Sequence, residues 1–199
     1  MLSNVFEYHP REPKGKHIFF SMGTLNEKKQ FDLLIRSFIE AFEADEQVEL
    51  RIGGSGPDEG KLKQLIDDSG RSRQIQMLGQ LARDETLAEY SMSDTFILLS
   101  PKETFGIVFR EAMAVGRPVI SLDNGGIRYN WNSDYGIIVE CKSDDLVPKV
   151  AQAMRDMVNN IDDYNLKKIS EETLAVFSAT DVSKRIEDVL QNSIHAFRA

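Results

Sequence analysis

Short apolar runs and longer amphipathic stretches alternate along the chain. The runs at 17–22, 48–52 and 95–99 predict strands, and the last is apolar at almost every position, which is typical of a strand buried on both faces. Between the first two runs, apolar positions recur with helical spacing and form one stripe, which comprises Phe31, Leu34, Ile35, Phe38, Ile39 and Phe42. Strands that alternate with helices predict a parallel sheet covered by helices on both faces.

The alternation continues through the middle of the chain. Further strands are predicted at 75–78, 118–122 and 136–139, with helices at about 84–90 and 105–115. Because crossovers between parallel strands are right-handed, this order predicts an α/β fold with a Rossmann-like, doubly wound parallel sheet. Toward the C-terminus the pattern becomes helical only, so extra C-terminal helices are expected.

Composition excludes several classes of protein. The chain has 199 residues and a net charge of -8, from 24 Lys and Arg against 32 Asp and Glu. Its hydrophobic fraction of 41% is that of a globular protein and argues against a disordered, collagen-like or disulfide-scaffold chain. The acidic surplus argues against nucleic acid or an anionic membrane surface as a partner, since both require a basic surface. No stretch approaches the roughly 20 apolar residues of a membrane span.

Four residues outside the main motifs have simple structural interpretations. Cys141, the one cysteine, cannot form an internal disulfide, which suggests a reducing, cytoplasmic location; it follows a strand and is expected to be buried. The histidines, His17 among them, lack the spacing of a zinc site and are expected at the surface or in linkers. Trp131 lies in a polar loop and is interpreted as its anchor rather than as a lid. Pro57 is expected at the first position of a helix.

The loop after the 95–99 strand introduces two carboxylates. In an open parallel sheet, ligands bind beyond the carboxyl ends of the strands, where the strand order switches. Glu103 lies in this loop, and Glu111 lies about two turns into the next helix, which is predicted to begin near Phe105. Free N–H groups at such a helix start can hold a phosphate, because the positive end of the helix dipole lies there.

A carboxylate on each side of a phosphate cradle cannot itself hold the phosphate, since like charges repel. Carboxylates accept hydrogen bonds from hydroxyl groups, so Glu103 and Glu111 are expected to contact sugar hydroxyls. The combination indicates a phosphorylated sugar or a nucleotide-sugar. On the residues alone, an equally good interpretation makes Glu103 a partner of the helix dipole and Glu111 a solvated helix residue.

The run at 103–111, ETFGIVFRE, resembles the E-x7-E signature of the group 1 retaining GT-B glycosyltransferases of the family 4-like type. Neighbouring segments agree with this resemblance. Residues 111–120 are similar to that family's EAMA-x-G-x-PVI stretch, residues 94–100 to its buried strand, and residues 54–57 to its G-x-G-P turn. The ordered set of motifs covers about residues 18–140.

The resemblance implies a role for each matching position. Glu103 matches the first glutamate of the signature, which contacts donor-sugar hydroxyls and is the expected catalytic residue, as a stabiliser or nucleophile on the far face of the sugar. Glu111 matches the second, which holds the ribose hydroxyls. Lys29 matches the lysine that neutralises the diphosphate, and Gln80 lies where a loop contacts the base. The remaining donor-binding positions, of which the last three are expected to offer backbone N–H groups to the diphosphate, are Thr104, Phe105, Gly106 and Ile107.

One donor-binding position departs from the family's pattern. Where the family has G-R-L after the first strand, this chain has Thr24 between Gly23 and Leu25. A neutral hydroxyl then replaces a charge-assisted donor, which predicts donor binding weaker by about tenfold. Lys28 or Arg128 is a candidate substitute cation.

The implied domain organisation is that of one half of a GT-B enzyme. Residues 1–16, which contain two prolines among charged residues, are interpreted as an interdomain linker remnant, and residues 17–178 as a nucleotide-sugar-binding, Rossmann-like domain. Residues 179–199 are expected to form a C-terminal helix that packs toward an N-terminal, acceptor-binding domain absent from this chain.

The implied function is the donor-binding domain of a retaining hexosyltransferase that requires no metal or other cofactor. Its donor is a UDP-, GDP- or ADP-linked sugar, and its expected role is surface polysaccharide or glycan synthesis in the cytoplasm. The fragment alone is expected to be inactive, and any peripheral membrane association would involve the missing domain. The alternative is a non-catalytic GT-B-like interaction or regulatory module. A dinucleotide-binding oxidoreductase is disfavoured because no G-x-G-x-x-G follows the first strand.

Overall fold

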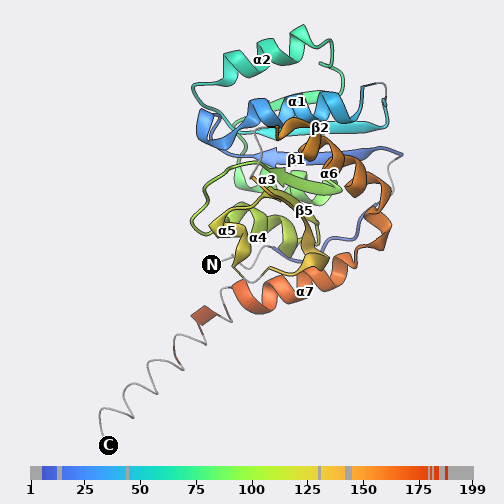
Figure 1. The fold of residues 1–199 in the computed structure, drawn as a ribbon. Coiled ribbons are helices and arrows are strands. Elements are labelled where there is room, and N and C mark those ends of the chain that lie inside the picture. Colours follow the sequence, from blue (N-terminus) through green and yellow to red (C-terminus); the bar gives the residue numbers. More distant parts are fainter. Residues whose placement is uncertain are drawn as a thin grey trace, which may run out of the picture.

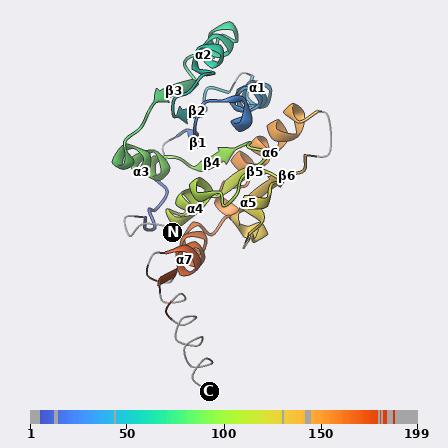
Figure 2. The ribbon, with the colours of Figure 1, turned by 90° about the vertical axis from the view of Figure 1, so that its left-hand side faces the viewer.

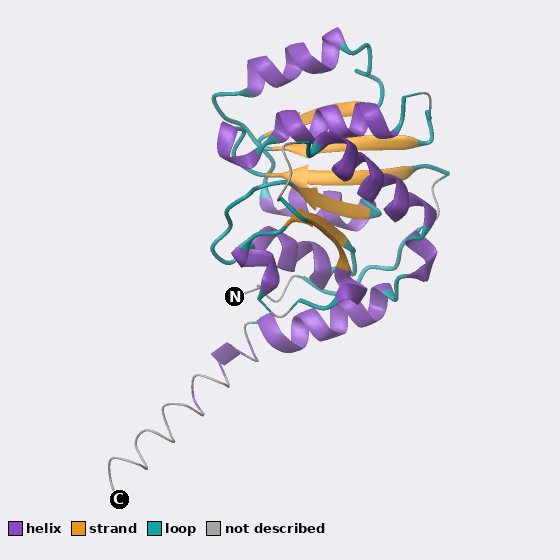
Figure 3. Cartoon of the chain, viewed as in Figure 1, coloured by secondary structure: helices purple, strands orange, loops and turns teal. Residues whose placement is uncertain are grey.

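The sheet has the predicted class and a doubly wound order. A computed structural model describes residues 6–12, 15–43, 45–129, 131–141, 145–178, 180, 182, 183 and 187. Within them, six parallel strands form one sheet in the order β3-β2-β1-β4-β5-β6, with helices on both sides (Figures 1 and 3). The strands are β1 (His17–Met22), β2 (Val48–Gly53), β3 (Ile75–Gly79), β4 (Thr95–Leu98), β5 (Val119–Leu122) and β6 (Gly136–Val139).

The helices form two layers around the sheet. Helix α1 packs against α2 and α6 on one face, whereas α3 and α4 lie on the other, where α4 packs against α7 (Figure 2). The α-helices are α1 (Phe31–Ala41), α2 (Glu59–Asp68), α3 (Arg83–Met92), α4 (Ile107–Ala114), α5 (Gly125–Arg128), α6 (Val147–Asn159) and α7 (Leu166–Phe177). Short 3-10 helices are η1 (Glu27–Lys29), η2 (Ser133–Tyr135) and η3 (Ile161–Asp163).

The strand order reverses direction between β1 and β4. From β1 the chain crosses over to β2 and β3 on one side, and from β4 it crosses to β5 and β6 on the other. Loops that leave the carboxyl ends of β1 and β4 therefore diverge, and a crevice between such loops is where open α/β sheets bind ligands.

Aromatic rings fill the core between the sheet and α3. Tyr90 of α3 is fully buried, and its ring meets Phe20 of β1 edge-on at a centroid distance of 5.3 Å. The Tyr90 ring also lies 5.4 Å from that of Phe96 in β4. Edge-to-face pairs of this kind stabilise a core beyond their buried area. The α1 stripe is confirmed on the other face, where Phe31, Leu34, Ile35, Phe38 and Phe42 are buried.

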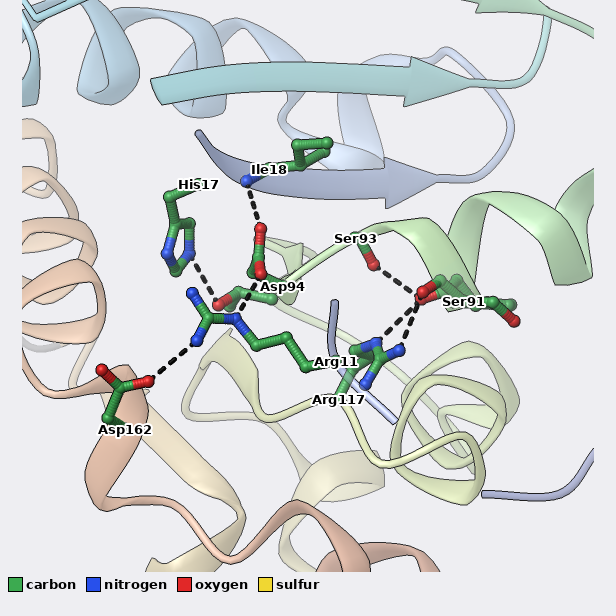
Figure 4. A network of polar contacts seen from close by, with 10 residues as sticks. Arg11, His17, Ile18, Ser91, Ser93, Asp94, Arg117 and Asp162 are labelled. Atoms are coloured by element: carbon green, nitrogen blue, oxygen red, sulfur yellow. Dashed lines mark hydrogen bonds and ion pairs between the residues drawn. The ribbon is translucent and has the colours of Figure 1, made fainter. Parts of the chain in front are cut away.

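A polar network closes the amino edge of the sheet (Figure 4). Asp94, just before β4, is 3% exposed, and its Oδ2 accepts a hydrogen bond from the backbone N–H of Ile18 in β1 at 2.7 Å. Its Oδ1 accepts from Nε of Arg11 at 2.5 Å, and Arg11 also donates to Asp162 at 2.8 Å. One buried carboxylate thus ties β1, β4 and the N-terminal segment together.

Arg117 performs a related task for α3 (Figure 4). Its side chain is fully buried and donates from Nε to the carbonyl of Tyr90 at 3.1 Å and from a terminal nitrogen to that of Ser91 at 2.8 Å. These carbonyls belong to the last turn of α3, where a cation complements the helix dipole. Burial lowers the pKa of Arg117.

The N-terminal segment is not separate from the domain. Phe6 is 6% exposed, and its ring lies edge-on to Tyr90 at 6.3 Å. The backbone N–H of His9 donates to the carbonyl of Val115 at 3.2 Å. Residues 6–12, interpreted from the sequence as linker, therefore pack onto the core. Most of the expected helix at 179–199 lies outside the described residues.

Four sequence predictions on single residues have mixed outcomes. His17 is buried, not at the surface, because β1 runs through the centre of the sheet. Cys141 is exposed, not buried, because it follows the edge strand β6. Pro57 precedes Asp58, the N-cap of α2, so it is not the first helical residue. Trp131 is confirmed as a loop anchor, since its half-buried ring packs edge-on against Tyr135 at 6.0 Å.

The buried His17 predicts acid sensitivity. Burial lowers the pKa of His17 to about 4, although nearby Asp94 raises it and Arg11 lowers it further. Below the unfolded-state pKa of 6.5 the unfolded chain gains a proton that the folded chain excludes, so stability falls as the pH decreases from 6.5 toward 4. We expect His17 to account for roughly 2 kcal/mol of lost unfolding free energy between pH 7.5 and 5.

The measurement is urea unfolding of the native chain and of His17→Gln at both pH values. The amide of the variant can still bond the Thr95 hydroxyl, which lies 3.0 Å from Nε2 of His17, but it does not titrate. The variant should lose about 2 kcal/mol less than the native chain. Equal losses in the two proteins would contradict the assignment.

Candidate functional site

Two charged side chains meet across the point where the strand order reverses. Lys29 lies in η1, which follows β1, and Glu103 lies in the loop that follows β4. Nζ of Lys29 donates to Oε1 of Glu103 at 2.5 Å, and the two side chains are 26% and 13% exposed. The structure therefore brings together Lys29, which is expected to bind the diphosphate, and Glu103, which is expected to bind the sugar. The two side chains are paired with each other.

Helix α4 begins two residues later than the sequence predicts. Gly106 has a φ of 62° and is the N-cap, so the first helical residue is Ile107 rather than Phe105. A right-handed α-helix cannot continue through a residue in the left-handed conformation, so α4 cannot begin before Gly106. Glycine adopts this conformation without strain. The backbone N–H groups of Ile107 and Val108 lie in the first turn, where helices lack internal partners. The predicted helix start is therefore wrong by two residues, whereas the expectation that the N–H groups of Phe105, Gly106 and Ile107 face the diphosphate stays a prediction.

Gly126 in α5 fixes the position of Glu103 from the other side. A Cβ atom at Gly126 would lie 2.7 Å from Cβ of Glu103 and 2.8 Å from its carbonyl oxygen, so only glycine fits there. Asn124 caps α5 by accepting from the N–H of Ile127 at 3.0 Å. Its Nδ2 donates to the carbonyl of Ser100 at 2.9 Å. The loop that carries Glu103 is thus attached to the loop after β5.

Arg110 donates hydrogen bonds to the backbone of α5, and the sequence interpretation did not identify it. It is 1% exposed, and one terminal nitrogen donates to the carbonyls of Gly126 at 3.0 Å, Ile127 at 3.3 Å and Tyr129 at 2.5 Å. Its guanidinium carbon lies 4.7 Å above the ring of Phe177. Burial lowers the pKa of Arg110 to about 10. No pattern signal could identify it, because the face of α4 that carries Arg110 is covered by α7, more than 50 positions later.

Glu111 is held by Tyr90 at the second turn of α4. The Tyr90 hydroxyl lies 3.2 Å from Oε2 of Glu111 and 3.2 Å from the carbonyl of Val108. Burial raises the pKa of the Glu111 carboxyl, whereas the Tyr90 hydrogen bond and the charge of Arg83 lower it. The contact engages Oε2 of the carboxylate.

The loops after β1 and β2 pack backbone against backbone. A Cβ atom at Gly54 would lie 2.0 Å from the carbonyl oxygen of Gly23, and one at Gly56 would lie 2.3 Å from that of Leu25. The N–H of Leu25 donates to the carbonyl of Ser55 at 3.0 Å. Thr24 is exposed within this fixed loop. The G-x-G-P glycines are therefore explained by loop packing alone.

Gln80 lies at the same edge of the sheet but farther along it. It follows β3 and accepts from the hydroxyl of Ser55 at 3.0 Å. Three strand spacings separate β3 from β4, which is about 14 Å. An extended ligand is needed to reach from Glu103 to Gln80.

The candidate substitute cations differ in their surroundings. Lys28 is exposed in η1, and its backbone carbonyl lies 3.4 Å from the Ser100 hydroxyl. Arg128 is exposed and makes two hydrogen bonds to Asp123, at 2.8 and 2.9 Å. The charge of Arg128 is therefore matched by an acid of its own loop.

Two other kinds of feature are absent from the described part of the chain. Within it, no group of three or more His, Cys, Asp and Glu side chains is placed to hold a metal ion. Within the same residues, no helix has both the length and the apolar character needed to cross a membrane.

Gly126 and Gly125 provide a matched test of the close contact with Glu103. Gly126→Ala is expected to lower the unfolding free energy by about 1–3 kcal/mol, since the new methyl group overpacks the Glu103 backbone. In Gly125→Ala the nearest atom would be 4.0 Å away, so an effect below about 0.5 kcal/mol is expected. Urea unfolding measures the free energy of unfolding of both variants. Equal effects would show that the close approach of Gly126 to Glu103 does not require a glycine.

Arg110 and Arg128 provide a second matched pair. Arg110→Met should lower the unfolding free energy by about 2–4 kcal/mol, because three buried carbonyls lose a charged donor. Arg128→Met should cost less than about 1 kcal/mol, since an exposed ion pair contributes little. Thermal and urea unfolding give the comparison. A small effect at Arg110 would mean that water replaces its hydrogen bonds.

The chain is similar to known proteins in sequence and in fold. Residues 6–172 match the family model described as Glycosyl transferases group 1. Over 170 residues the chain is 25% identical to the UDP-N-acetylglucosamine--peptide N-acetylglucosaminyltransferase GtfA subunit of Streptococcus gordonii, with 85% of this chain and 30% of that protein covered. Over 182 residues it is 25% identical to the alpha-monoglucosyldiacylglycerol synthase of Streptococcus pneumoniae, with 90% and 40% covered. The chain thus spans less than half the length of these relatives.

A solved structure adds support for the fold. The pneumococcal O-GlcNAc transferase GtfA, in complex with UDP and GlcNAc, matches with a TM-score of 0.75 and 20% identity, over 96% of this chain and 38% of that chain. At this identity the likeness concerns the fold alone. Together with the family match, it confirms the resemblance carried by residues 103–111. The chain belongs to the group 1 glycosyl transferase family.

Proposed function

We propose that this chain is the donor-binding part of a retaining glycosyltransferase and that it binds a nucleotide-sugar at the carboxyl edge of the sheet. One observation carries the proposal: Lys29, Glu103 and the start of α4 meet where the strand order reverses. The family match and the UDP named with a neighbouring structure support this choice of ligand class.

The diphosphate would lie between Lys29 and the first turn of α4. The N–H groups of Ile107 and Val108 and the positive end of the helix dipole favour an anion there. A lysine and a helix start together supply the charge that other transferases take from a metal ion, so we propose a metal-independent reaction. The donor nucleoside diphosphate is UDP, GDP or ADP, with the base toward Gln80.

Glu111 would accept hydrogen bonds from the ribose hydroxyls. The Tyr90 contact to Oε2 orients the carboxylate, and Oε1 would accept from a ribose hydroxyl. Because burial raises the pKa of Glu111, this contact should weaken on acidification sooner than it would at an exposed glutamate.

Glu103 would contact hydroxyls of the transferred hexose. Retention means that the new glycosidic bond forms on the face of the sugar from which the nucleoside diphosphate departs. A carboxylate near the opposite face stabilises the positive charge that develops on the sugar ring or attacks it as a nucleophile. We propose Glu103 for this role because it matches the first glutamate of the E-x7-E signature.

The acceptor would be bound by a different part of a larger protein. We propose an N-terminal acceptor-binding domain, without which residues 17–178 bind donor but transfer nothing. The names of the relatives include a peptide and a diacylglycerol acceptor, so surface glycan or glycolipid synthesis on the cytoplasmic side of a membrane is the proposed setting. Any membrane association would involve that other domain.

A non-catalytic module is the second candidate, and Thr24 is the observation that favours it. An exposed threonine stands where the family has an arginine, and Arg128 is paired with Asp123. Turnover of a nucleotide-sugar by the longer protein that contains this chain would exclude this candidate.

The direct test of donor binding is calorimetry with UDP, GDP and ADP. We expect one of them to bind at or below millimolar concentration. Glu111→Gln should weaken that binding about tenfold, because a charge-assisted contact to the ribose is lost. The same substitution should leave binding of the corresponding 2′,3′-dideoxynucleoside diphosphate unchanged within about twofold. Absence of binding for all three nucleotides would overturn the proposed function.

A further inference from the structure

The Lys29–Glu103 ion pair occupies the crevice in which the donor is proposed to bind. It joins η1 to the loop after β4, so it crosses from one diverging half of the sheet to the other. At 2.5 Å and with both side chains largely buried, it is a close contact rather than a loose surface pair. A ligand that needs both residues therefore encounters them already bound to each other.

The backbone and the aliphatic chain of Lys29 direct its ammonium group toward Glu103. Its backbone N–H donates to the carbonyl of Asn26 at 3.0 Å, which fixes η1. The Cδ and Cε atoms of its side chain lie over Gly23, each 3.9 Å from where a Cβ atom would stand. The ammonium group is thus directed across the crevice by the path of its own aliphatic chain.

Glu103 is equally restrained on its side. Gly126 lies against its Cβ and backbone, and Asn124 holds the same loop through the carbonyl of Ser100. Neither partner can leave by a large loop movement without breaking these contacts. What can change is the direction of the two side-chain ends.

Lys28 is exposed beside Lys29 in η1, whereas the arginines near the site are already engaged. Arg128 is paired with Asp123, and Arg110 is buried beneath α5, where it bonds to three carbonyls. Thr24 carries no charge. A diphosphate in the crevice therefore competes with Glu103 for the Lys29 ammonium.

We infer that Lys29 is a positioning residue shared by the diphosphate and sugar subsites: it holds Glu103 in the empty crevice, and a bound diphosphate withdraws it and frees the Glu103 carboxylate to accept sugar hydroxyls. This inference rests on the proposed function and adds a coupling between its two subsites. A nucleoside diphosphate without sugar breaks the ion pair and leaves Glu103 with no new partner. An intact nucleotide-sugar supplies hydroxyl groups to the released carboxylate, so the crevice favours the donor over the leaving product.

The test is whether one substitution strengthens or weakens the binding of a nucleoside diphosphate. Glu103→Gln should bind UDP, GDP or ADP, whichever binds the native chain, at least fivefold more tightly in 50 mM salt, because the Lys29 charge is no longer neutralised. Loss of an ordinary ligand contact or of folding would weaken binding instead. The matched control is Glu27→Gln, which makes the same change in net charge from an exposed position in η1 and should change affinity by less than twofold.

A double-mutant cycle separates coupling from simple repulsion. Lys29→Met should weaken nucleoside diphosphate binding at least tenfold, and in that background Glu103→Gln should change affinity by less than twofold. A fivefold gain that persists without Lys29 would show that the carboxylate repels the diphosphate directly, which would overturn the inference.

The remaining outcomes are also decisive. No binding of any of the three nucleotides to the native chain would defeat the proposed function itself. Binding that Glu103→Gln weakens or leaves unchanged would defeat the coupling and spare the function. If Glu103→Gln proves unfolded by circular dichroism, Glu103→Asp replaces it, since the shorter side chain withdraws from Lys29 and should also give tighter binding.

Discussion

The reversal of strand order between β1 and β4 is the constraint on which the rest of the structure depends. At the amino edge the two strands are closed together by Asp94, which accepts from the N–H of Ile18 and from Arg11. At the carboxyl edge the crossovers carry the loops apart, and the Lys29–Glu103 contact spans the gap between them. The same pair of strands is therefore fixed at one end and open at the other, which leaves room for a ligand without loosening the core.

Each half of the open edge is held rigid by contacts that exclude a Cβ atom. In one half, Gly54 lies against the carbonyl of Gly23, and in the other Gly126 lies against Glu103. Backbone placed so closely has few alternative positions, because interiors packed at this density transmit rather than absorb a displacement. The shape of the crevice is thus set by main-chain packing, and side chains such as Lys29 provide the adjustable part. Motif glycines that resemble ligand-binding features are accounted for by this packing.

Much of the fold could be predicted from periodicity, whereas burial of single polar residues could not. The α1 helix follows from a single apolar stripe, and central strands such as β4 follow from apolar runs that are buried on both faces. The start of α4 was predicted two residues early because helical spacing does not reveal that Gly106 adopts a left-handed conformation. His17 was expected at the surface and Arg110 was not singled out, because what covers these two side chains comes from distant parts of the chain. The roles of Glu103 and Lys29 came from a family resemblance; their mutual contact required the three-dimensional structure.

The positions of the arginines bear on the role proposed for Lys29 in binding a diphosphate. Arg110 and Arg117 are both almost wholly buried, and both donate to backbone carbonyls at the ends of helices. A buried guanidinium that satisfies carbonyls is expensive to remove and is not free to bind a ligand. Apart from the exposed Lys28, the positive charge nearest Glu103 is then that of the Lys29 ammonium and of the start of α4, which together amount to roughly one and a half positive charges. Because a diphosphate carries more negative charge than that, the ion pair between Lys29 and Glu103 should lower the affinity for the proposed nucleotide donor.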